Sequence, residues 1–246
     1  MTPPAAPLRL AGAETELCPL GEADALLPYP ARLRDWLADD ELRTLAGFAV
    51  AKRRREWLAA RLAAKRLLGR RLAAAGAPRP APRIRILNAP SREPYVALGA
   101  GDAPDRALPI SLAHAGGYGA CALGEPGALV GVDLERIEPR APAWRELMAD
   151  ESELTPELAA SAESLTRLWC AKEAVLKLLG TGLSVELRGV RPREDGSVRL
   201  LGAALARWTE RGGRPIRVHF ARPHDSVLAL AVASTGGALG DETAAR

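Results

Sequence analysis

The sequence of 246 residues has few aromatic side chains, because phenylalanine, tryptophan and tyrosine together make up 4% of it. Proteins that bind single-stranded nucleic acid stack the bases on aromatic side chains, so this scarcity argues against that class. The point matters because residues 52–71 hold nine lysines and arginines against one glutamate. With no recognisable nucleic-acid-binding module either, we interpret this stretch as a basic helix face and expect no nucleic-acid partner.

Long apolar runs are absent as well. No run approaches the ~20 apolar residues that a helix needs to cross a bilayer. The first residues, MTPPAAPLRLAGAETEL, lack the continuous apolar stretch of a signal peptide. We therefore expect no membrane segment, and we expect the Pro/Ala-rich start and the last stretch, TGGALGDETAAR, to be poorly ordered.

Cysteine and histidine are scarce, with three residues of each type. Cys18, Cys121 and Cys170 cannot all pair with one another, and they show no metal-ligand spacing. Such cysteines suit a reducing compartment, so we expect a cytoplasmic protein without a zinc site.

The rest of the composition is that of an ordinary globular protein. Apolar residues make up 48% of the sequence and charged residues 26%. The length suits one large domain or two small ones. The formal net charge of +4 favours anionic partners without requiring them.

The first part of the chain predicts a long helix followed by strands. Residues 52–74 consist mostly of Ala, Leu, Arg and Lys, which favour a helix, and Gly76 ends it. Gly116 and Gly117 separate two strand-like segments and predict a hairpin. The other elements expected here are a helix at 31–46 and strands at 83–87, 94–98, 109–115 and 118–123.

The second part repeats this order. After a strand at 128–137, Thr155 is a favourable N-cap for a helix that continues to Gly180, with a break near Ser161. Residues 204–211 fit a helix or a strand equally well. The remaining expected strands are 184–190, 197–202, 215–221 and 226–234.

This element order predicts an α+β fold. We expect two similar halves related by pseudo-twofold symmetry, each a small, mostly antiparallel sheet packed with a long helix. The expected halves are residues 1–126 and 127–246. No repeat is visible in the sequence itself, so this duplication is inferred from the order of the elements.

Charged residues interrupt the apolar face of the second long helix. The segment WCAKEAVLKLLGTG places Lys172 within the apolar stripe, three residues from an apolar residue on either side. Glu173 lies four residues before Lys177, which is the favourable orientation for an ion pair on a helix. Taken alone, the segment fits a surface helix whose lysine stems run along the apolar edge.

Residues 131–135, GVDLE, carry two carboxylates on one face of a strand, because Asp133 and Glu135 alternate with apolar residues. The opposite face carries Val130, Val132 and Leu134. Two such carboxylates repel one another unless a cation or water lies between them, and Mg²⁺ beside a phosphate suits them. Alone, the pair also fits solvated charges on an edge strand. If the charged helix packs across this strand, Glu173 completes a three-carboxylate site.

GVDLE followed by WCAKEAVLKLLGTGLS resembles the two signature motifs of the 4′-phosphopantetheinyl transferases, (I/V)G(I/V)D(I/L/V)E and (F/W)xxKE(A/S)xxK. The length and the two-half organisation are similar to the Sfp-type branch and not to the half-length trimeric holo-acyl-carrier-protein synthases. Weaker similarity extends through the basic helix and the SLAHAGG hairpin.

The resemblance implies transfer of the phosphopantetheine arm of coenzyme A to a serine of an apo acyl or peptidyl carrier protein, with release of 3′,5′-ADP. It implies an active site in the cleft between the halves, where Asp133, Glu135 and Glu173 bind Mg²⁺, with Mn²⁺ as the alternative ion. Glu173 would also take the serine proton. Lys172 and Lys177 would contact coenzyme A phosphates, and Lys177 would neutralise the departing group.

The resemblance further implies clients in fatty-acid, polyketide or nonribosomal peptide synthesis, and a monomer. Carrier proteins are usually acidic around their serine, so the positive charge of this chain would steer them. Trp169 is expected in the core. Trp144 and Met148 are expected either in the core or on a carrier-docking surface.

Nucleotide contacts are implied at several basic positions. His114, taken alone, fits a partly buried structural histidine, but the family's Ser-His-Ser triplet meets the 3′-phosphate of coenzyme A at this place. Ala113 and Ala115 replace both serines here. The basic helix would form one wall of the cleft, with Arg54 and Arg61 as its contacts.

Two other positions depart from the family pattern. Where the family often has Gly-Lys-Pro, this sequence has Arg92, Glu93 and a proline, and Arg92 would supply the positive charge. Thr181 stands where a lysine is common in Gly-Lys-Gly.

Two alternative interpretations stay open. One is a non-catalytic coenzyme A or carrier-protein binding protein with the same fold, and the other is a basic nucleic-acid-binding protein. The three carboxylates and two motif lysines argue against the first alternative, because binding alone needs no general base.

Overall fold

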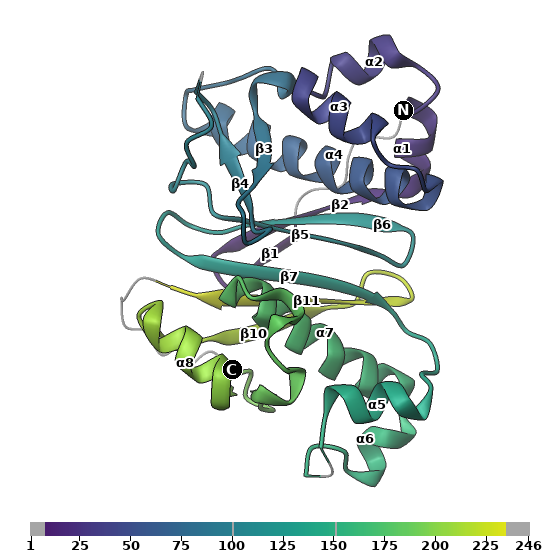
Figure 1. Cartoon of the computed structure of the whole chain (residues 1–246), viewed down its shortest axis with the longest axis vertical. Coiled ribbons are helices and arrows are strands. Elements are labelled where there is room, and N and C mark those ends of the chain that lie inside the picture. The colour runs from purple at the N-terminus through teal and green to yellow at the C-terminus, as the bar shows by residue number, and fades with distance from the viewer. Residues whose placement is uncertain (1–7, 100, 151, 235–246) are drawn as a thin grey trace, which may run out of the picture.

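The computed structural model describes residues 8–99, 101–150 and 152–234. Both ends that we expected to be poorly ordered, residues 1–7 and 235–246, lie outside the described residues. Figure 1 shows four stacked layers, with helices on the two outer faces and two sheets between them. Among the helices that the structure describes, none is both long and apolar enough to cross a lipid bilayer.

The N-terminal half is built around a four-stranded antiparallel sheet of order β1-β2-β6-β5. The 24-residue helix α4 packs on it and buries leucines such as Leu58 and Leu62 against the strands. The hairpin β3-β4 stands apart as a separate two-stranded sheet. The bounds are β1 Leu8–Leu10, β2 Ala13–Pro19, α1 Leu20–Leu26, α2 Pro30–Arg34, α3 Asp39–Ala46, α4 Ala51–Ala74, η1 Ala81–Arg83, β3 Arg85–Asn88, β4 Pro94–Ala97, β5 Ile110–Ala115 and β6 Tyr118–Leu123.

The C-terminal half has a three-stranded antiparallel sheet of order β7-β11-β10. Helix α7 packs on this sheet, and Val175, Leu176 and Leu179 are fully buried there. The bounds are β7 Leu129–Arg136, α5 Pro142–Met148, α6 Pro156–Ala160, α7 Ala162–Leu179, η2 Gly182–Ser184, η3 Leu187–Gly189, β8 Val190–Pro192, β9 Val198–Leu200, α8 Gly202–Glu210, β10 Arg217–Ala221 and β11 Ser226–Ala233.

The two halves repeat one topology. In each half a strand leads through short helices to a long helix, then to a two-stranded hairpin and finally to the last two strands of the main sheet, with α8 inserted after the hairpin in the C-terminal half. The sheet orders β2-β6-β5 and β7-β11-β10 correspond strand for strand, with β1 added at one edge. The predicted α+β fold of two similar halves is confirmed. Because β6 ends at Leu123 and β7 begins at Leu129, we propose the boundary near residue 126.

An apolar layer of small side chains joins the two sheets. Ala113, Ala120 and Ala122 of the first sheet face valines and leucines of β7 and β11. Within this layer lie Val130, Val132 and Leu134, so the predicted apolar face of the GVDLE strand is confirmed. The hydroxyl of Ser111 accepts a hydrogen bond from the Val132 amide across the same boundary, at 3.0 Å.

Several elements differ from the sequence predictions. The expected helix at 31–46 is two helices, α2 and α3, and the strand expected at 184–190 is mostly the two 3₁₀ turns η2 and η3. The ambiguous segment 204–211 is helical, in α8, and the break at Ser161 is confirmed, since this residue caps α7 with its hydroxyl. The sequence predictions missed β1, β2, α1 and α5.

Candidate active site

The close contact between α7 and β7 depends on Gly131. A Cβ atom at this position would lie 1.9 Å from the carbonyl oxygen of Ala174 and 2.7 Å from the amide nitrogen of Leu178, so only glycine fits. Asp133 and Glu135 alternate with the apolar face of β7 and therefore lie on the α7 side of the strand. The GVDLE glycine thus lets the helix approach these two carboxylates.

Asp133 is buried and pairs with Lys177 of α7. The Lys177 ammonium donates to Oδ1 of Asp133 at 2.8 Å and to the carbonyl oxygen of Val132 at 3.0 Å. Oδ2 of Asp133 is also buried but has no hydrogen-bond partner. Since a buried carboxylate oxygen without a partner is costly, this atom marks a place for a further cation or donor.

Glu135 is held from two sides. The indole of Trp169 donates to Oε1 at 3.2 Å, and Arg140 donates to Oε2 at 2.9 Å. Arg140 also lies over the ring of Trp144, which stacks on Trp169 at a centroid distance of 4.5 Å. Burial raises the pKa of Glu135, the Asp133 carboxylate raises it further, and Arg140 opposes both effects.

Glu173 is the third carboxylate, and it comes from α7. Burial raises its pKa to about 7, the charge of Asp133 and more weakly that of Glu135 act in the same direction, and Lys177 opposes them. Its Oε1 is buried without a hydrogen-bond partner. The structure therefore brings together the three carboxylates that the sequence singled out, with Lys177 beside them.

The donor chemistry of this cluster fits a hard divalent cation. Its carboxylate oxygens are the ligands that Mg²⁺ prefers, and two of them, on Asp133 and Glu173, are unsatisfied. Across the described residues, however, no group of three or more His, Cys, Asp and Glu side chains is already arranged to hold a metal ion. Lys177 and Arg140 instead pair with two of the carboxylates.

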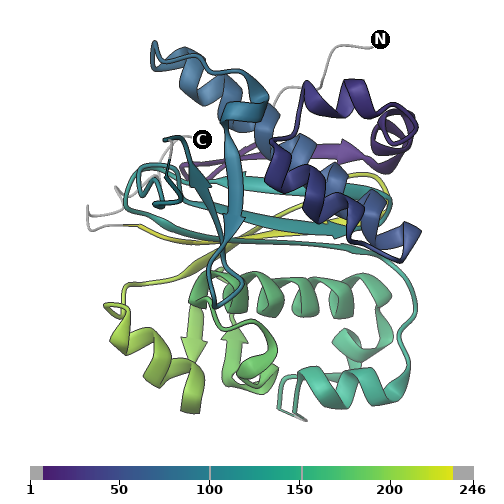
Figure 2. The same ribbon diagram turned by 45° about the horizontal axis from the view of Figure 1, so that its top comes forward.

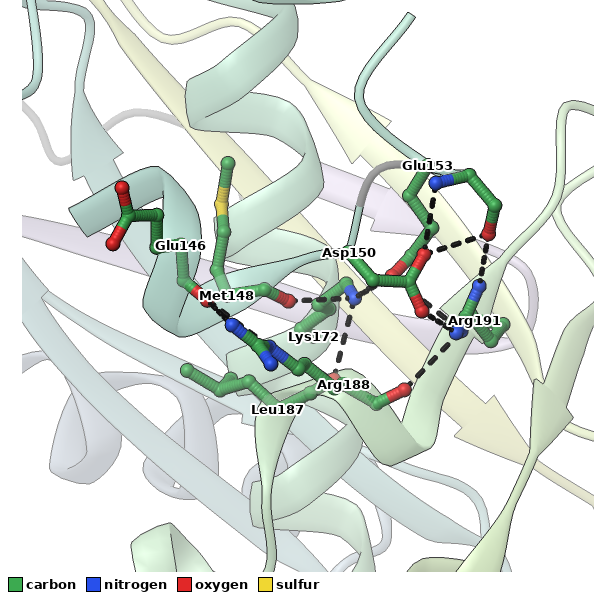
Figure 3. Close-up of polar contacts among 9 residues, drawn as sticks. Glu146, Met148, Asp150, Glu153, Lys172, Leu187, Arg188 and Arg191 are labelled. Atoms are coloured by element: carbon green, nitrogen blue, oxygen red, sulfur yellow. Dashed lines mark hydrogen bonds and ion pairs between the residues drawn. The ribbon is translucent and has the colours of Figure 1, made fainter. Parts of the chain in front are cut away.

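Lys172 lies on the other side of α7 and corrects one sequence prediction. Its fully buried ammonium donates to the carbonyl oxygens of Met148 at 2.8 Å and Leu187 at 3.3 Å, and it pairs with Glu153 at 2.8 Å (Figure 3). With all of its donors directed inward, Lys172 has none left for a coenzyme A phosphate. The expected phosphate contact is therefore contradicted.

A cleft of about 590 Å³ lies between the two halves, next to Glu135. The start of α4, the β5-β6 turn and the end of β7 form its walls. His114 lines this cleft, with Nε2 3.2 Å from Arg53 and Nδ1 3.6 Å from Glu56. Burial lowers the pKa of His114, the carboxylate of Glu56 opposes this, and the charges of Arg53 and Lys177 lower it further.

The two arginines chosen from the basic helix do not line this cleft. Arg61 is buried, stacks on Trp57 at 4.6 Å and lies 3.9 Å from Glu41, so it belongs to the core. Arg54 donates to the carbonyl oxygen of Phe48 at 3.1 Å. The burial of Arg61 contradicts its expected coenzyme A contact, while the expected contact of Arg54 stays a prediction.

Arg53 lines the cleft instead, and the sequence analysis missed it. Helical periodicity could have separated Arg53 from Arg54, because neighbouring residues point about 100° apart around a helix. The two arginines therefore lie on different faces of α4. Arg140 was missed as well. It carries no motif, and only the path of the chain after β7 brings it back to Glu135.

The turn between β3 and β4 holds the departures from the family pattern. Arg92 is exposed and has a positive φ of 70°. Glu93 is partly exposed and pairs with Arg211 at 2.8 Å, and Arg211 also donates to the carbonyl oxygen of Leu179. Thr181 follows Gly180, the C-cap of α7, and donates weakly to the Leu176 carbonyl oxygen.

Met148, Trp144 and Trp169 all pack against the C-terminal core. Met148 is fully buried, so the core alternative holds for it. Trp169 is partly buried against the C-terminal core, as expected, but its indole also binds Glu135. Trp144 packs on the same core.

Comparison with known proteins gives a family match in the C-terminal half. Residues 129–231 match the family model described as the 4′-phosphopantetheinyl transferase superfamily. No curated protein matches the chain. The chain is similar to the crystal structure of holo-[acyl-carrier-protein] synthase (AcpS) from Neisseria meningitidis, with 24% identity, 43% of this chain and 97% of that chain covered, and a TM-score of 0.35.

Proposed function

We propose, from the match of residues 129–231 to the 4′-phosphopantetheinyl transferase superfamily, that this protein transfers the phosphopantetheine arm of coenzyme A to a serine of an apo acyl or peptidyl carrier protein. The observation that carries the proposal is the meeting of Asp133, Glu135 and Glu173 with Lys177, beside a cleft lined by His114 and Arg53. The assignment to the Sfp-type branch rests on the length and the two halves.

In the proposed reaction the serine oxygen forms a bond to the phosphorus that bears the pantetheine arm. The bond from that phosphorus to the bridging oxygen breaks, and 3′,5′-ADP leaves. The serine proton goes to Glu173, directly or through a water. A carboxyl group with a pKa of about 7 is suited to this, because it is partly ionised at neutral pH and still binds a proton well.

A divalent cation, Mg²⁺ or alternatively Mn²⁺, would be held by oxygens of Asp133, Glu135 and Glu173. It would supply positive charge to the pyrophosphate. Lys177 contributes a cation from the same helix, and its ammonium, which donates to Asp133, would neutralise the departing group.

The nucleotide end of coenzyme A is proposed to lie in the cleft between the halves. Arg53 and His114 present a positive guanidinium and an imidazole from adjacent elements. Arg92 at the exposed β3-β4 turn is a further proposed phosphate contact. Ala113 is buried between the sheets, so the serine missing at that position would not have faced the cleft.

The proposed client belongs to fatty-acid, polyketide or nonribosomal peptide synthesis. The net charge of +4 supports steering of an acidic carrier surface. We propose a monomer, because the two halves supply each other with the sheet-to-sheet contact. The three cysteines are free and buried, which supports a cytoplasmic location.

The deciding experiment is intact-mass spectrometry of apo carrier proteins incubated with this protein, coenzyme A and Mg²⁺. We expect the mass gain of one phosphopantetheine group, and no gain when Mg²⁺ is replaced by a chelator. Failure across acyl and peptidyl carriers would refute the transferase proposal. Coenzyme A binding without any transfer would instead favour the non-catalytic alternative.

A further inference from the structure

Two buried lysines occupy equivalent places in the two halves. Lys65 lies in α4 and Lys172 in α7, and both side chains are fully buried. Each follows an alanine pair or a Cys-Ala pair in the middle of the long helix that covers its sheet. A fully buried ammonium is rare enough to require an explanation.

Two of the three contacts correspond between the two ammonium groups. Lys172 pairs with Glu153, which precedes its helix, and donates to the carbonyl oxygen of Leu187, the first residue of η3 (Figure 3). Lys65 pairs with Glu41, which precedes its own helix, and donates to the carbonyl oxygen of Ala81, the first residue of η1. A second carbonyl completes each set, from Met148 for Lys172 and from Ile84 for Lys65.

The residues around Lys65 show that the buried lysine also occurs in a half that has no carboxylate site. The residue after Lys65 is Arg66, where the other half has Glu173, and it pairs with Glu22. Five residues after Lys65, Arg70 pairs with Glu16 of β2 at 2.6 Å, as Lys177 pairs with Asp133 of β7. The N-terminal half therefore keeps the lysine anchor where two arginines stand at the positions of Glu173 and Lys177.

In the C-terminal half the same anchor reaches the carboxylates through α5. Lys172 binds the carbonyl of Met148, the last residue of α5, and so fixes the end of that short helix to α7. Trp144 of α5 stacks on Trp169 and lies beneath Arg140. Trp169 and Arg140 are the two donors to Glu135.

A second layer of ion pairs closes the anchor from outside. Arg191 of β8 pairs with Asp150 and lies 3.4 Å from Glu153. Arg188 donates to the carbonyl oxygen of Glu146 in α5 (Figure 3). The segment that leaves α5 is therefore held between α7, η3 and β8.

We propose that Lys172 is a positioning residue for the transfer reaction, which acts by locking α5 to α7 and so holding Glu135 and Glu173 in register. This rests on the proposed function for its kinetic consequence. Its structural consequence, the locking of α5, holds whatever the substrate.

The test compares two neutral double variants. Lys172→Met with Glu153→Gln removes both buried charges of the C-terminal anchor, so neither partner is left as an isolated charge. Lys65→Met with Glu41→Gln removes the corresponding pair in the N-terminal half and is the control, although it also takes away the carboxylate that lies 3.9 Å from the buried Arg61. Coenzyme A affinity is measured by calorimetry, transfer by carrier mass, and backbone ordering by hydrogen exchange, all well below the melting temperatures.

In the Lys172/Glu153 variant we expect kcat to fall about tenfold or more, because small displacements of catalytic groups have effects of that size. The Kd for coenzyme A should stay within about twofold, since no phosphate contact is removed. Hydrogen exchange should accelerate in α5. The control should lose thermal stability but keep kcat.

Three results would overturn the proposal. A rise of about tenfold in the Kd for coenzyme A with unchanged kcat would make Lys172 a phosphate ligand. Unchanged kcat with faster exchange would reduce it to a fold anchor alone, and unchanged exchange in α5 would remove the anchor itself. If the wild-type protein transfers nothing, the proposed function fails, while the exchange comparison still decides whether Lys172 locks α5.

Discussion

Glu173 carries a charge that the fold makes unfavourable. Its carboxylate is partly buried, faces Asp133 and Glu135, and has one oxygen without a hydrogen-bond partner. Lys177 only partly offsets these effects. An ionised Glu173 therefore lowers the stability of the fold, and binding of a cation or a proton relieves this effect. Groups with such shifted pKa values are often found at functional sites.

The pH dependence of stability follows from the raised pKa of Glu173. Between its usual value of 4.5 and about 7, the folded state binds more protons than the unfolded state. The free energy of unfolding therefore falls as the pH rises through this window. Glu173→Gln removes the charge, so in the presence of a chelator we expect it to be more stable than the wild type at pH 8, by about 1–2 kcal/mol after allowance for solvent screening.

Urea denaturation at pH 8 and pH 5 checks this prediction, because the difference should shrink at the lower pH. Added Mg²⁺ should stabilise the wild type more than the variant. A Glu173→Gln variant that is less stable than the wild type at pH 8 would contradict the raised pKa of Glu173. Transfer activity should be lost in the variant, as measured by carrier mass.

At the residue scale, the sequence predicted the carboxylates better than the cations. Asp133, Glu135 and Glu173 could be found because strand and helix periodicity fix which side chains share a face. Lys172 was misassigned because it is next to Glu173 in sequence but about 100° away around the helix, among carbonyls from distant loops. Arg53 and Arg140 depend on how separate elements pack, which periodicity does not reveal.

At the scale of elements, the site depends on how closely α7 lies on β7. Gly131 permits this contact, and Gly119 of β6 does the same for α4, where a Cβ atom would lie 2.2 Å from the Ala60 amide nitrogen. Helix packing alone therefore requires the glycine of GVDLE, whether or not coenzyme A or a metal ion binds. The carboxylates on β7 meet Glu173 only because the two backbones come this close.

Gly131→Ala should therefore push α7 away from β7. We expect a loss of about 1–3 kcal/mol in the free energy of unfolding, because the added methyl group overlaps backbone atoms that cannot rotate away. Transfer activity should fall as Glu173 separates from Asp133. Thermal and urea denaturation, with carrier mass as the activity readout, check both effects.

Gly69→Ala is the matched control for this substitution. Gly69 lies inside α4, and nothing lies within 4 Å of the added methyl group. Alanine is the better helix former, so this variant should gain about 0.5–1 kcal/mol. Equal losses in the two variants would show that the helix contact at Gly131 is not the cause.

The elements that the sequence predicted correctly have local signals. The hairpin β5-β6, the break at Ser161 and the long helices follow from glycine pairs, caps and composition. Strand β2 was missed because its partner β6 lies about 100 positions further along the chain, which no local pattern shows. Strand β1 pairs only with β2, so it was missed together with that strand. The turns η2 and η3 replaced an expected strand for a similar reason, since η3 supplies a carbonyl to Lys172.

At the scale of the whole molecule, the two halves are joined mainly by the apolar layer between the sheets. Within the described parts of the chain, Glu93 and Arg211 form the one ion pair between the halves. The β3-β4 hairpin reaches toward α7 to make it, as Figure 2 shows. The pair lies against Gly180, the C-cap of the helix that carries Glu173.

We expect this pair to contribute modestly to stability. A double-mutant cycle of Glu93→Gln and Arg211→Gln should give a coupling free energy of about 0.5–1 kcal/mol at low salt, because both side chains are partly exposed. High salt should reduce it. The same cycle on Arg207 and Glu210, an exposed pair within α8, is the control and should give less. A coupling free energy no larger than that of the control pair would show that the Glu93–Arg211 ion pair does not help to hold the two halves together.

The strand order also sets how this chain can fold. β2 pairs with β6, and β7 pairs with β11, each about 100 residues further along the chain. Each sheet is therefore completed only by strands at the end of its own half. Contacts so distant in sequence form slowly, because the entropy cost of closing a long loop must be met before strand pairing contributes any favourable free energy. During synthesis, the strand that carries Asp133 and Glu135 must wait for β11 before it has a partner in its own sheet.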